Sequence, residues 1–373
     1  MKKILFLTGT RADFGKIKSL IQKLESEEDF EVYVFVTGMH LLWEYGYTLL
    51  EIESCKFKNV HTFGNHTHET TMDLSLAKTI EGLSAYVKQV SPDLIVIHGD
   101  RIETLAGAIV GALNNILVAH IEGGEVSGTV DELIRHSVTK LSHIHFVSNE
   151  PAGKRLEQMG EIQESIFVIG SPDVDLMLSN NLPDIEEVKK YYEIPFDDYA
   201  VAMFHPVTTE ADKMREYAVN FTNALIKGSD NFVVIFPNND LGSSAILTAY
   251  ESLKRNPRFR IIPSLRFEYF LSLLKCATFI IGNSSAGIRE APYFGTPIIN
   301  IGTRQNNRSQ LPEIINVDYD KENISRALAK VKKQKKFPVI SGFGNGNSAE
   351  LFIKNLRKDI FWKINQQKQF RDL

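Results

Sequence analysis

Short apolar runs that alternate with amphipathic stretches constrain the fold of this chain more than any other feature. The runs are rich in Ile, Val and Phe and read as nearly continuous apolar strands, which are typical of a parallel sheet covered by helices on both faces. The expected strands of the first half are Ile4 to Thr8, Glu31 to Thr37, Leu94 to His98, Leu117 to Ile121, His145 to Val147 and Ile166 to Ile169. The covering helices are expected at Ile17 to Glu25, Met72 to Val90, Glu103 to Leu113 and Glu132 to Leu141.

The same pattern restarts near residue 200, which indicates a second domain of the same class. Its expected strands are Ala200 to Phe204, Phe232 to Phe236, Phe259 to Ile262, Thr278 to Ile281 and Pro297 to Ile301, and its helices lie near Met214 to Leu225, Ala245 to Leu253, Phe267 to Leu274 and Gly287 to Phe294. A length of 373 residues also favours two cores over one. We therefore predict an α/β protein with two doubly wound, Rossmann-like domains.

Turn-forming residues mark the boundary between these domains. They cluster at Gly170-Ser171-Pro172 and again in the polar stretch from Ser179 to Pro183. We place the first domain at residues 1–170 and the second at residues 171–347. The remaining segment, residues 348–373, carries a helical pattern, and we expect it to pack back on the first domain.

Composition and charge limit the possible partners and the compartment. A net charge of -4, from 42 basic and 46 acidic residues, provides no broad basic surface for nucleic acid. The only two cysteines, Cys55 and Cys276, fit no metal-binding spacing and favour a reduced, cytoplasmic setting. The apolar run that begins the chain ends at Gly9, too soon for a signal peptide or a membrane span. No His and Cys triplet has zinc spacing, so we expect neither a metal nor a cofactor.

Charged side chains follow two consecutive strands of the first domain. His98-Gly99-Asp100-Arg101 ends one strand and His120-Ile121-Glu122-Gly123-Gly124-Glu125 ends the next, with Asp131 a few residues later. In an open parallel sheet ligands bind outside the carboxyl ends of the strands. Carboxylates that converge there have divergent proton affinities, which suits acid and base catalysis.

Each of these groups also has a structural interpretation. Glu122 could be the partner of Arg101 or His120 in an ion pair, because a carboxylate just past a buried strand needs a partner. Asp131 could be a helix N-cap. Among the histidines, we expect His98 and His136 to support the site without acting in it.

The loop from Thr8 to Asp13 follows the first strand and precedes a helix, where free amides can face an anion. It lacks the three glycines of the dinucleotide fingerprint, which makes a redox enzyme less favoured. Arg11 is placed to pair with a phosphate or a carboxylate.

The second domain contains a loop suited to phosphate. Gly282-Asn283-Ser284-Ser285-Ala286-Gly287 follows a strand and opens a helix that carries Arg289 and Glu290. Two glycines that flank two serines suggest the close approach of a ligand. His205 ends the first strand of this domain and could face a diphosphate, and the rim is completed by Phe236 to Asp240 and Gly302 to Gln305.

Taken together, these motifs resemble the hydrolysing UDP-N-acetylglucosamine 2-epimerases of bacterial sialic acid synthesis. The resemblance extends from Gly9-Thr10-Arg11 to Gly302-Thr303-Arg304-Gln305 and covers almost the whole chain. Non-hydrolysing relatives usually carry His-Arg-Arg-Glu where this chain has His205-Pro206-Val207, which favours the hydrolysing branch. The resemblance implies the GT-B fold, in which the two domains face a central cleft, and it implies no kinase activity.

The resemblance also implies a mechanism and the residues that perform it. A base removes the C2 proton as UDP leaves C1, and water then adds to the resulting glycal, which gives N-acetylmannosamine. The implied catalytic residues are Asp100, Glu122, Asp131 and His205, without a decision on which carboxylate is the base. The implied binding residues are Arg11, His40, Arg101, Asn238, Asn283, Ser284, Ser285, Arg289, Glu290 and Arg304. The partner is a UDP-sugar, and a homodimer or homotetramer is expected.

Three other functions remain open from the sequence. The first is the same chemistry on UDP-2,4-diacetamido-2,4,6-trideoxyglucose, for legionaminic acid. The second is a GT-B glycosyltransferase, which needs an acceptor. The third is a nucleotide-sugar sensor without catalysis, which the acids at the strand ends disfavour.

Overall fold

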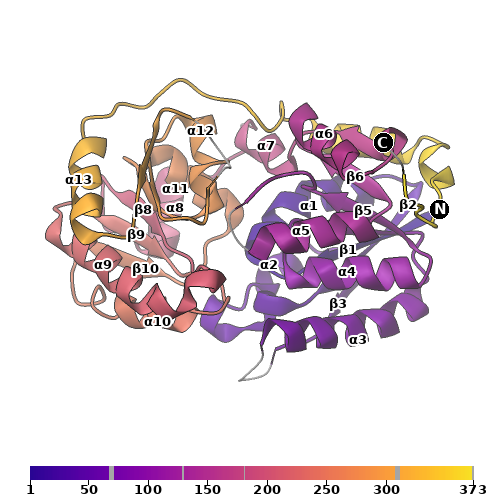
Figure 1. The fold of residues 1–373 in the computed structure, drawn as a ribbon, viewed down its shortest axis with the longest axis horizontal. Coiled ribbons are helices and arrows are strands. Elements are labelled where there is room, and N and C mark those ends of the chain that lie inside the picture. The colour runs from indigo at the N-terminus through magenta and orange to yellow at the C-terminus, as the bar shows by residue number, and fades with distance from the viewer. Residues whose placement is uncertain (67–70, 128–129, 180, 307–310, 372–373) are drawn as a thin grey trace. The chain divides into compact units, whose positions relative to one another are not determined.

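The computed structural model describes residues 1–66, 71–127, 130–179, 181–306 and 311–371. The chain divides into two compact units (Figure 1). The first unit comprises Met1–Glu125, Asp131–Ser179 and Gly342–Leu373, and the second comprises Val126–Val130 and Asn180–Ser341. No helix in the described ranges combines the length and apolar character needed to cross a bilayer.

The first unit is built on a parallel sheet that, within the described residues, has seven strands in the order β3-β2-β1-β4-β5-β6-β7. The central strands β4 and β5 are buried along their whole length, as the continuous apolar runs predict. The strands are β1 (Lys2–Thr8), β2 (Phe30–Val36), β3 (Val60–Thr62), β4 (Leu94–His98), β5 (Leu117–Ile121), β6 (Ile144–Val147) and β7 (Ile166–Val168).

Helices cover this sheet, and the C-terminal helix is one of them. The ring of Phe352 in α14 lies 4.7 Å from that of Phe146, inside the core of the first unit. The C-terminal segment therefore packs on the first unit, as predicted, and Figure 1 marks both chain ends there. The helices are α1 (Arg11–Glu25), α2 (Leu49–Ser54), α3 (Met72–Val90), α4 (Ile102–Leu113), α5 (Val130–Leu141), α6 (Glu150–Gln158), α7 (Pro172–Met177) and α14 (Ser348–Leu356).

The second unit repeats this architecture on a parallel sheet with six strands in its described part, in the order β10-β9-β8-β11-β12-β13. Its strands are β8 (Ala200–Met203), β9 (Phe232–Ile235), β10 (Phe259–Ile262), β11 (Ile280–Gly282), β12 (Ile298–Ile301) and β13 (Ile314–Val317). Its helices are α8 (Ile185–Tyr192), α9 (Met214–Lys227), α10 (Ser243–Tyr250), α11 (Phe267–Cys276), α12 (Ala291–Phe294) and α13 (Lys321–Val331). The predicted fold class of two doubly wound sheets is confirmed.

The division between the units differs from the expected boundaries at residues 170 and 347. Helix α7 lies beyond residue 170 yet packs against α1, so the first unit continues to Ser179. The returning segment also joins the first unit earlier than Ser348. There the amide of Ser171 donates to the carbonyl of Phe343, and the side chain of Asn149 donates to that of Gly342.

Candidate active site

Each sheet has a topological switch point, where the strand order reverses and ligands of doubly wound proteins bind. In the first unit it lies between β1 and β4, whose carboxyl ends lead into residues 9–11 and 99–101. In the second it lies between β8 and β11, which lead into residues 204–206 and 283–285. The predicted site residues therefore gather at two corresponding sheet edges.

The loop after β1 is closed by a residue of its own helix. The carboxylate of Asp13 accepts hydrogen bonds from the amides of Gly9, at 3.0 Å, and Thr10, at 3.2 Å, and from the Thr8 hydroxyl. Burial raises the pKa of Asp13. The expectation that these amides face an external anion is therefore wrong, because Asp13 takes them. Arg11 is held beside the loop by Glu51, with 2.6 Å between Nε and Oε2.

His40 lies beneath this loop, fully buried. Its Nε2 is 3.0 Å from the hydroxyl of Thr8 and its Nδ1 is 2.6 Å from that of Thr48. Burial lowers the pKa of His40 to about 3, so the ring is neutral. Both ring nitrogens are hydrogen-bonded to threonine hydroxyls within the protein. The prediction that His40 contacts UDP is therefore corrected: His40 supports the loop instead.

Glu122 follows β5 and is the most constrained of the predicted acids. Its φ of 74° lies in the left-handed region, which residues other than glycine rarely adopt. Its Oε2 lies 3.0 Å from Nε2 of His98 and 3.4 Å from Nζ of Lys16, and all three side chains are buried. His98, which we expected to support the site without acting in it, contacts the Glu122 carboxylate. Backbone strain of this kind costs about 1–3 kcal/mol and is concentrated at functional sites.

Asp100 follows β4 and pairs with the guanidinium of Arg135 on α5, which is fully buried. Arg135 also donates to the carbonyl of Glu125, at 3.2 Å. A fully buried guanidinium is costly unless it is paired, so this pair holds the Asp100 carboxylate in place.

Asp131 and Arg101 lie at the starts of the two neighbouring helices. Helix α5 begins at Val130, so Asp131 lies inside its first turn and is not the N-cap that the structural interpretation expected. A carboxylate in a first turn is favoured by the helix dipole. Arg101 is the N-cap residue of α4, and its side chain makes no capping hydrogen bond. His136 lies farther along α5, half-exposed and 3.3 Å from Glu132.

In the second unit, Asn283 ties the ends of β8 and β11 together. Its Oδ1 accepts from the amide of His205 at 2.6 Å, and its Nδ2 donates to the carbonyl of His205 at 2.8 Å. The side chain of Gln305 donates to the carbonyl of Asn283 at 2.8 Å, and that of Arg304 at 3.4 Å. Asn283 is fully buried, so its role here is to shape the loop.

The ring of His205 has a defined hydrogen-bonding pattern. The amide of Asn238 donates to Nδ1 of His205 at 3.0 Å, so in the neutral ring the proton lies on Nε2. Nε2 is thus a donor, as a group that binds a phosphate oxygen must be. Asn238, expected to bind UDP, acts on the His205 ring through its backbone.

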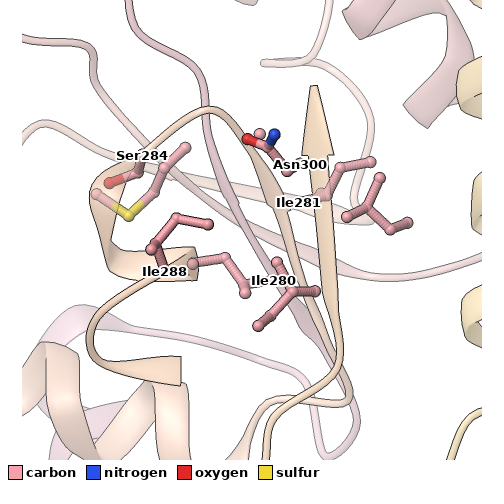
Figure 2. A pocket seen from close by; sticks show the side chains of 10 residues that line it. Ile280, Ile281, Ser284, Ile288 and Asn300 are labelled. Carbon is pink, nitrogen blue, oxygen red and sulfur yellow. The ribbon is translucent and has the colours of Figure 1, made fainter. Parts of the chain in front are cut away.

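Ser284 and Ser285 form a tight turn after β11. Gly282, at a φ of 138°, allows it, because a Cβ there would lie 1.8 Å from the carbonyl oxygen of Met203. A small cavity of about 10 Å³ lies beside Ser284, and five of its ten lining residues are isoleucines, among them Ile281 and Ile288 (Figure 2). It is smaller than typical ligand pockets of roughly 300–1,000 Å³, so a nucleotide does not fit within it.

The helix predicted from Gly287 to Phe294 is interrupted. Residues 285–287 form a 3-10 turn, and α12 starts only at Ala291, because Pro292 suits the first turn of a helix and not its interior. Arg289 and Glu290, both expected at the UDP, are buried in the connection between the two.

Lys16 was not predicted from the sequence. It lies in α1 between the buried Phe14 and Ile17, and a lysine on the buried face of an amphipathic helix is the signal that could have revealed it. Within the described residues there is no cluster of three or more potential metal ligands.

These observations define a class: two-domain α/β proteins with doubly wound sheets, one sheet edge carrying buried acids and the other a loop of small polar residues. The family follows from comparison with known proteins. Residues 22–357 match the model of the UDP-N-acetylglucosamine 2-epimerase family, and the chain belongs to that family.

The relatives cover nearly all of the chain. A UDP-N-acetylglucosamine 2-epimerase of Neisseria meningitidis serogroup B is 48% identical over 377 residues, 100% of each chain. The UDP-N,N'-diacetylbacillosamine 2-epimerase (hydrolyzing) of Legionella pneumophila is 33% identical over 94% of each. A crystal structure of the Methanocaldococcus jannaschii UDP-GlcNAc 2-epimerase in complex with UDP-GlcNAc and UDP has a TM-score of 0.82 at 24% identity, covering 95% of this chain and 99% of that one. This structural likeness shows the shared GT-B-like fold.

Proposed function

We propose that this protein is a hydrolysing UDP-N-acetylglucosamine 2-epimerase that converts UDP-N-acetylglucosamine and water to N-acetylmannosamine and UDP, for sialic acid synthesis. The observation that carries the proposal is the buried Glu122, held at a strained backbone position between His98 and Lys16. The 48% identical relative named for this activity supports the choice of sugar. The hydrolysing branch is supported by His205-Pro206-Val207 and by the word hydrolyzing in the name of the 33% identical relative.

The reaction needs a base at C2 and stabilisation of the departing diphosphate. One carboxylate among Asp100, Glu122 and Asp131 takes the C2 proton while the bond from C1 to UDP breaks, which leaves a 2-acetamidoglucal. Water then adds at C1, and a second acid returns a proton to the opposite face of C2. His98 and Lys16 lie beside Glu122. Whether the Glu122 carboxyl is protonated or not, it therefore has neighbours that carry a positive charge or a proton.

The second unit binds the UDP in this proposal. The Nε2 proton of His205 donates to the diphosphate, and Ser284 and Ser285 line its path, with Arg304 beside them. Asn283 keeps His205 and the serine turn at a fixed spacing. We assign Arg11 to the UDP moiety and Arg101 to the sugar or the phosphate.

The test is incubation with UDP-N-acetylglucosamine in heavy water. We expect release of UDP and free N-acetylmannosamine that carries deuterium at C2. Product that remains attached to UDP would refute the hydrolysing assignment, and dependence on an added acceptor would favour a glycosyltransferase. Binding of the UDP-sugar without any turnover would indicate a nucleotide-sugar sensor without catalysis.

Glu122→Gln separates chemistry from binding. Because a positioned acid or base contributes about a hundred- to ten-thousand-fold, we expect at least a hundredfold loss of kcat with unchanged affinity for UDP. Glu157→Gln, an exposed change on α6, is the matched control and should turn over normally. Near-normal turnover by Glu122→Gln would remove this residue from the chemistry.

The 33% identical relative keeps a second substrate open, since it is named for UDP-N,N'-diacetylbacillosamine. The two sugars differ at C4 and C6. Comparison of kcat/KM for the two nucleotide sugars with the purified protein decides between them, and a higher value for the diacetamido sugar would overturn the proposed substrate.

A further inference from the structure

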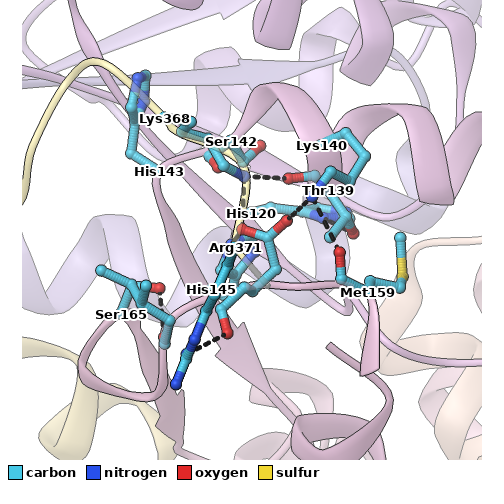
Figure 3. Close-up of polar contacts among 12 residues, drawn as sticks. His120, Thr139, Lys140, Ser142, His143, His145, Met159, Ser165, Lys368 and Arg371 are labelled. Carbon is cyan, nitrogen blue, oxygen red and sulfur yellow. Dashed lines mark hydrogen bonds and ion pairs between the residues drawn. The ribbon is translucent and has the colours of Figure 1, made fainter. Parts of the chain in front are cut away.

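His120 lies in β5, two residues before Glu122, and is fully buried. Its Nε2 is 2.9 Å from the carbonyl oxygen of Gly99, and its Nδ1 is 3.3 Å from the hydroxyl of Thr139 on α5. Figure 3 shows His120 and Thr139 in a polar cluster with Lys368 and Arg371 of the C-terminal tail. No role in the proposed reaction uses this ring.

The contacts define which nitrogen carries the proton. A carbonyl oxygen only accepts hydrogen bonds, so Nε2 of His120 carries the hydrogen and donates it to Gly99. Nδ1 is then the acceptor, and the Thr139 hydroxyl is its donor. The pKa of His120 is lowered to about 3, chiefly by burial; the hydrogen bond to Gly99 opposes this, His145 and His98 add to the lowering, and Glu122 acts against it. The ring is therefore neutral and is itself no proton carrier near neutral pH.

Two hydrogen bonds that run in opposite directions connect the ends of β4 and β5. The amide of Gly99 donates to the carbonyl of Ile121 at 3.0 Å, and His120 donates back to the carbonyl of Gly99. Asp100 follows Gly99 directly, and Glu122 follows Ile121 directly. The two acids thus extend from a pair of strand ends that His120 fastens together.

Thr139, the hydrogen-bond partner of His120 on α5, is itself bound by the C-terminal tail. The carbonyl of Thr139 accepts a hydrogen bond from Nζ of Lys368 at 3.1 Å, and Lys368 also donates to the carbonyl of Ser142 at 2.7 Å (Figure 3). The C-terminal tail thereby fixes the last turn of α5, the helix whose first turns carry Asp131 and Arg135.

We propose that His120 is a positioning residue that sets the spacing of Asp100 and Glu122 through the carbonyl of Gly99, with Thr139 holding its ring in the required orientation. The proposal rests on the proposed function. Misplacement of a reacting group by about 1 Å costs up to a hundredfold in rate, so the loss of this contact lowers kcat while leaving the UDP loop of the second unit intact.

The experiment compares His120→Leu with His120→Gln, whose side-chain amide keeps a donor near the position of Nε2. We expect kcat to fall by about 30- to 100-fold in the leucine variant and by less than about tenfold in the glutamine variant. The affinity for UDP and the shape of the pH–rate profile should stay as in the wild type. Loss of a limb of that profile would mean that His120 itself transfers a proton, and a kcat within threefold of wild type for folded His120→Leu would refute the role.

Thr139→Val covers the case in which His120→Leu does not fold, because valine keeps the shape of threonine without its hydroxyl. We expect a drop of roughly three- to tenfold in kcat, restored by Thr139→Ser. Unchanged kcat in Thr139→Val would overturn the proposal. The wild-type protein is assayed first, so absence of turnover refutes the proposed function separately. The hydrogen bonds of His120 are tested directly by the ¹⁵N chemical shifts of its ring in the ligand-free protein. A protonated Nδ1 at neutral pH would contradict the assigned hydrogen bonds.

Discussion

Acidification below about pH 6.5 should destabilise the first unit, because two of its histidines are buried as neutral rings. His40 and His120 have pKa values of about 3, against 6.5 for an unperturbed histidine. Both are fully buried in the first unit, and every ring nitrogen has a partner there. Protonation of either ring in the folded state would place a charge in the core.

The direction follows from proton binding in the two states. Below about pH 6.5 the unfolded chain binds a proton at each histidine and the folded chain does not, so the free energy of unfolding falls as the pH falls. The loss begins near 6.5 and ends only near the folded pKa of about 3. Between about pH 7 and pH 5 each ring contributes a loss of about 2 kcal/mol, or about 4 kcal/mol for the two.

Other groups modify this figure in known directions. Burial lowers the pKa of His145 as well, which adds to the loss. The raised pKa of Asp13 acts in the opposite direction, since the folded state then binds the proton more readily. The pKa of Glu161, lowered to about 2, matters only below its ordinary value of 4.5 and therefore outside this range.

The assay uses the two tryptophans of the chain, Trp43 and Trp362, which both belong to the first unit. Urea unfolding followed by their fluorescence reports this unit selectively. In His120→Gln one titrating ring is gone, so the loss between about pH 7 and pH 5 should shrink by about 2 kcal/mol. A free energy of unfolding that is flat over this range, or an equal loss in wild type and His120→Gln, would refute the assignment of a neutral buried ring.

Two further predictions concern the site. Glu122→Gly relieves the positive φ of 74°, so its unfolding free energy should exceed that of Glu122→Ala by about 1 kcal/mol, although both lack activity; equal urea midpoints for the two would argue against backbone strain. Asn283→Leu removes the two hydrogen bonds to the backbone of His205 and should weaken UDP binding at least tenfold, about 1.4 kcal/mol, by calorimetry. Asn306→Leu, at an exposed position, is the control, and equal UDP affinity in both variants would remove Asn283 from the UDP site.

The fold was predictable where burial on both faces makes a strand continuously apolar. The expected bounds of β4 and β5, which are buried along their whole length, match the structure. The edge strands β3 and β13 were missed, and both are short and carry polar residues such as His61 and Asn316. Edge position alone does not explain this, because the edge strand β10 was predicted with its observed bounds. The boundary at residue 170 failed because the packing of α7 on α1 is a long-range contact that local turn formers do not reveal.

The site was predictable as a set of strand ends and unpredictable as a set of contacts. Spacing places Asp100 and Glu122 at one edge, yet no local pattern says that Arg135 pairs with one and Lys16 with the other. The histidines show the limit best. His40 and His98 are equally suggestive in sequence, but one is enclosed by two threonine hydroxyls and the other contacts Glu122. Only the three-dimensional surroundings separate them.

The two units share a topology and differ in chemistry, which locates what makes this chain an epimerase. Both sheets reverse their order at the same place, between the first and fourth strand of each unit. At that place the first unit carries the ionisable Asp100 and Arg101 after β4, and Glu122, at a strained φ, follows the neighbouring strand β5. The second carries an amide clamp, Asn283, and a serine turn that needs Gly282. In the proposed function, topology therefore determines where the ligand binds, and the residues that follow each strand determine whether that edge transfers protons or holds a phosphate. Exchanging the residues after β4 and β11 between the units should accordingly abolish both functions without changing either sheet.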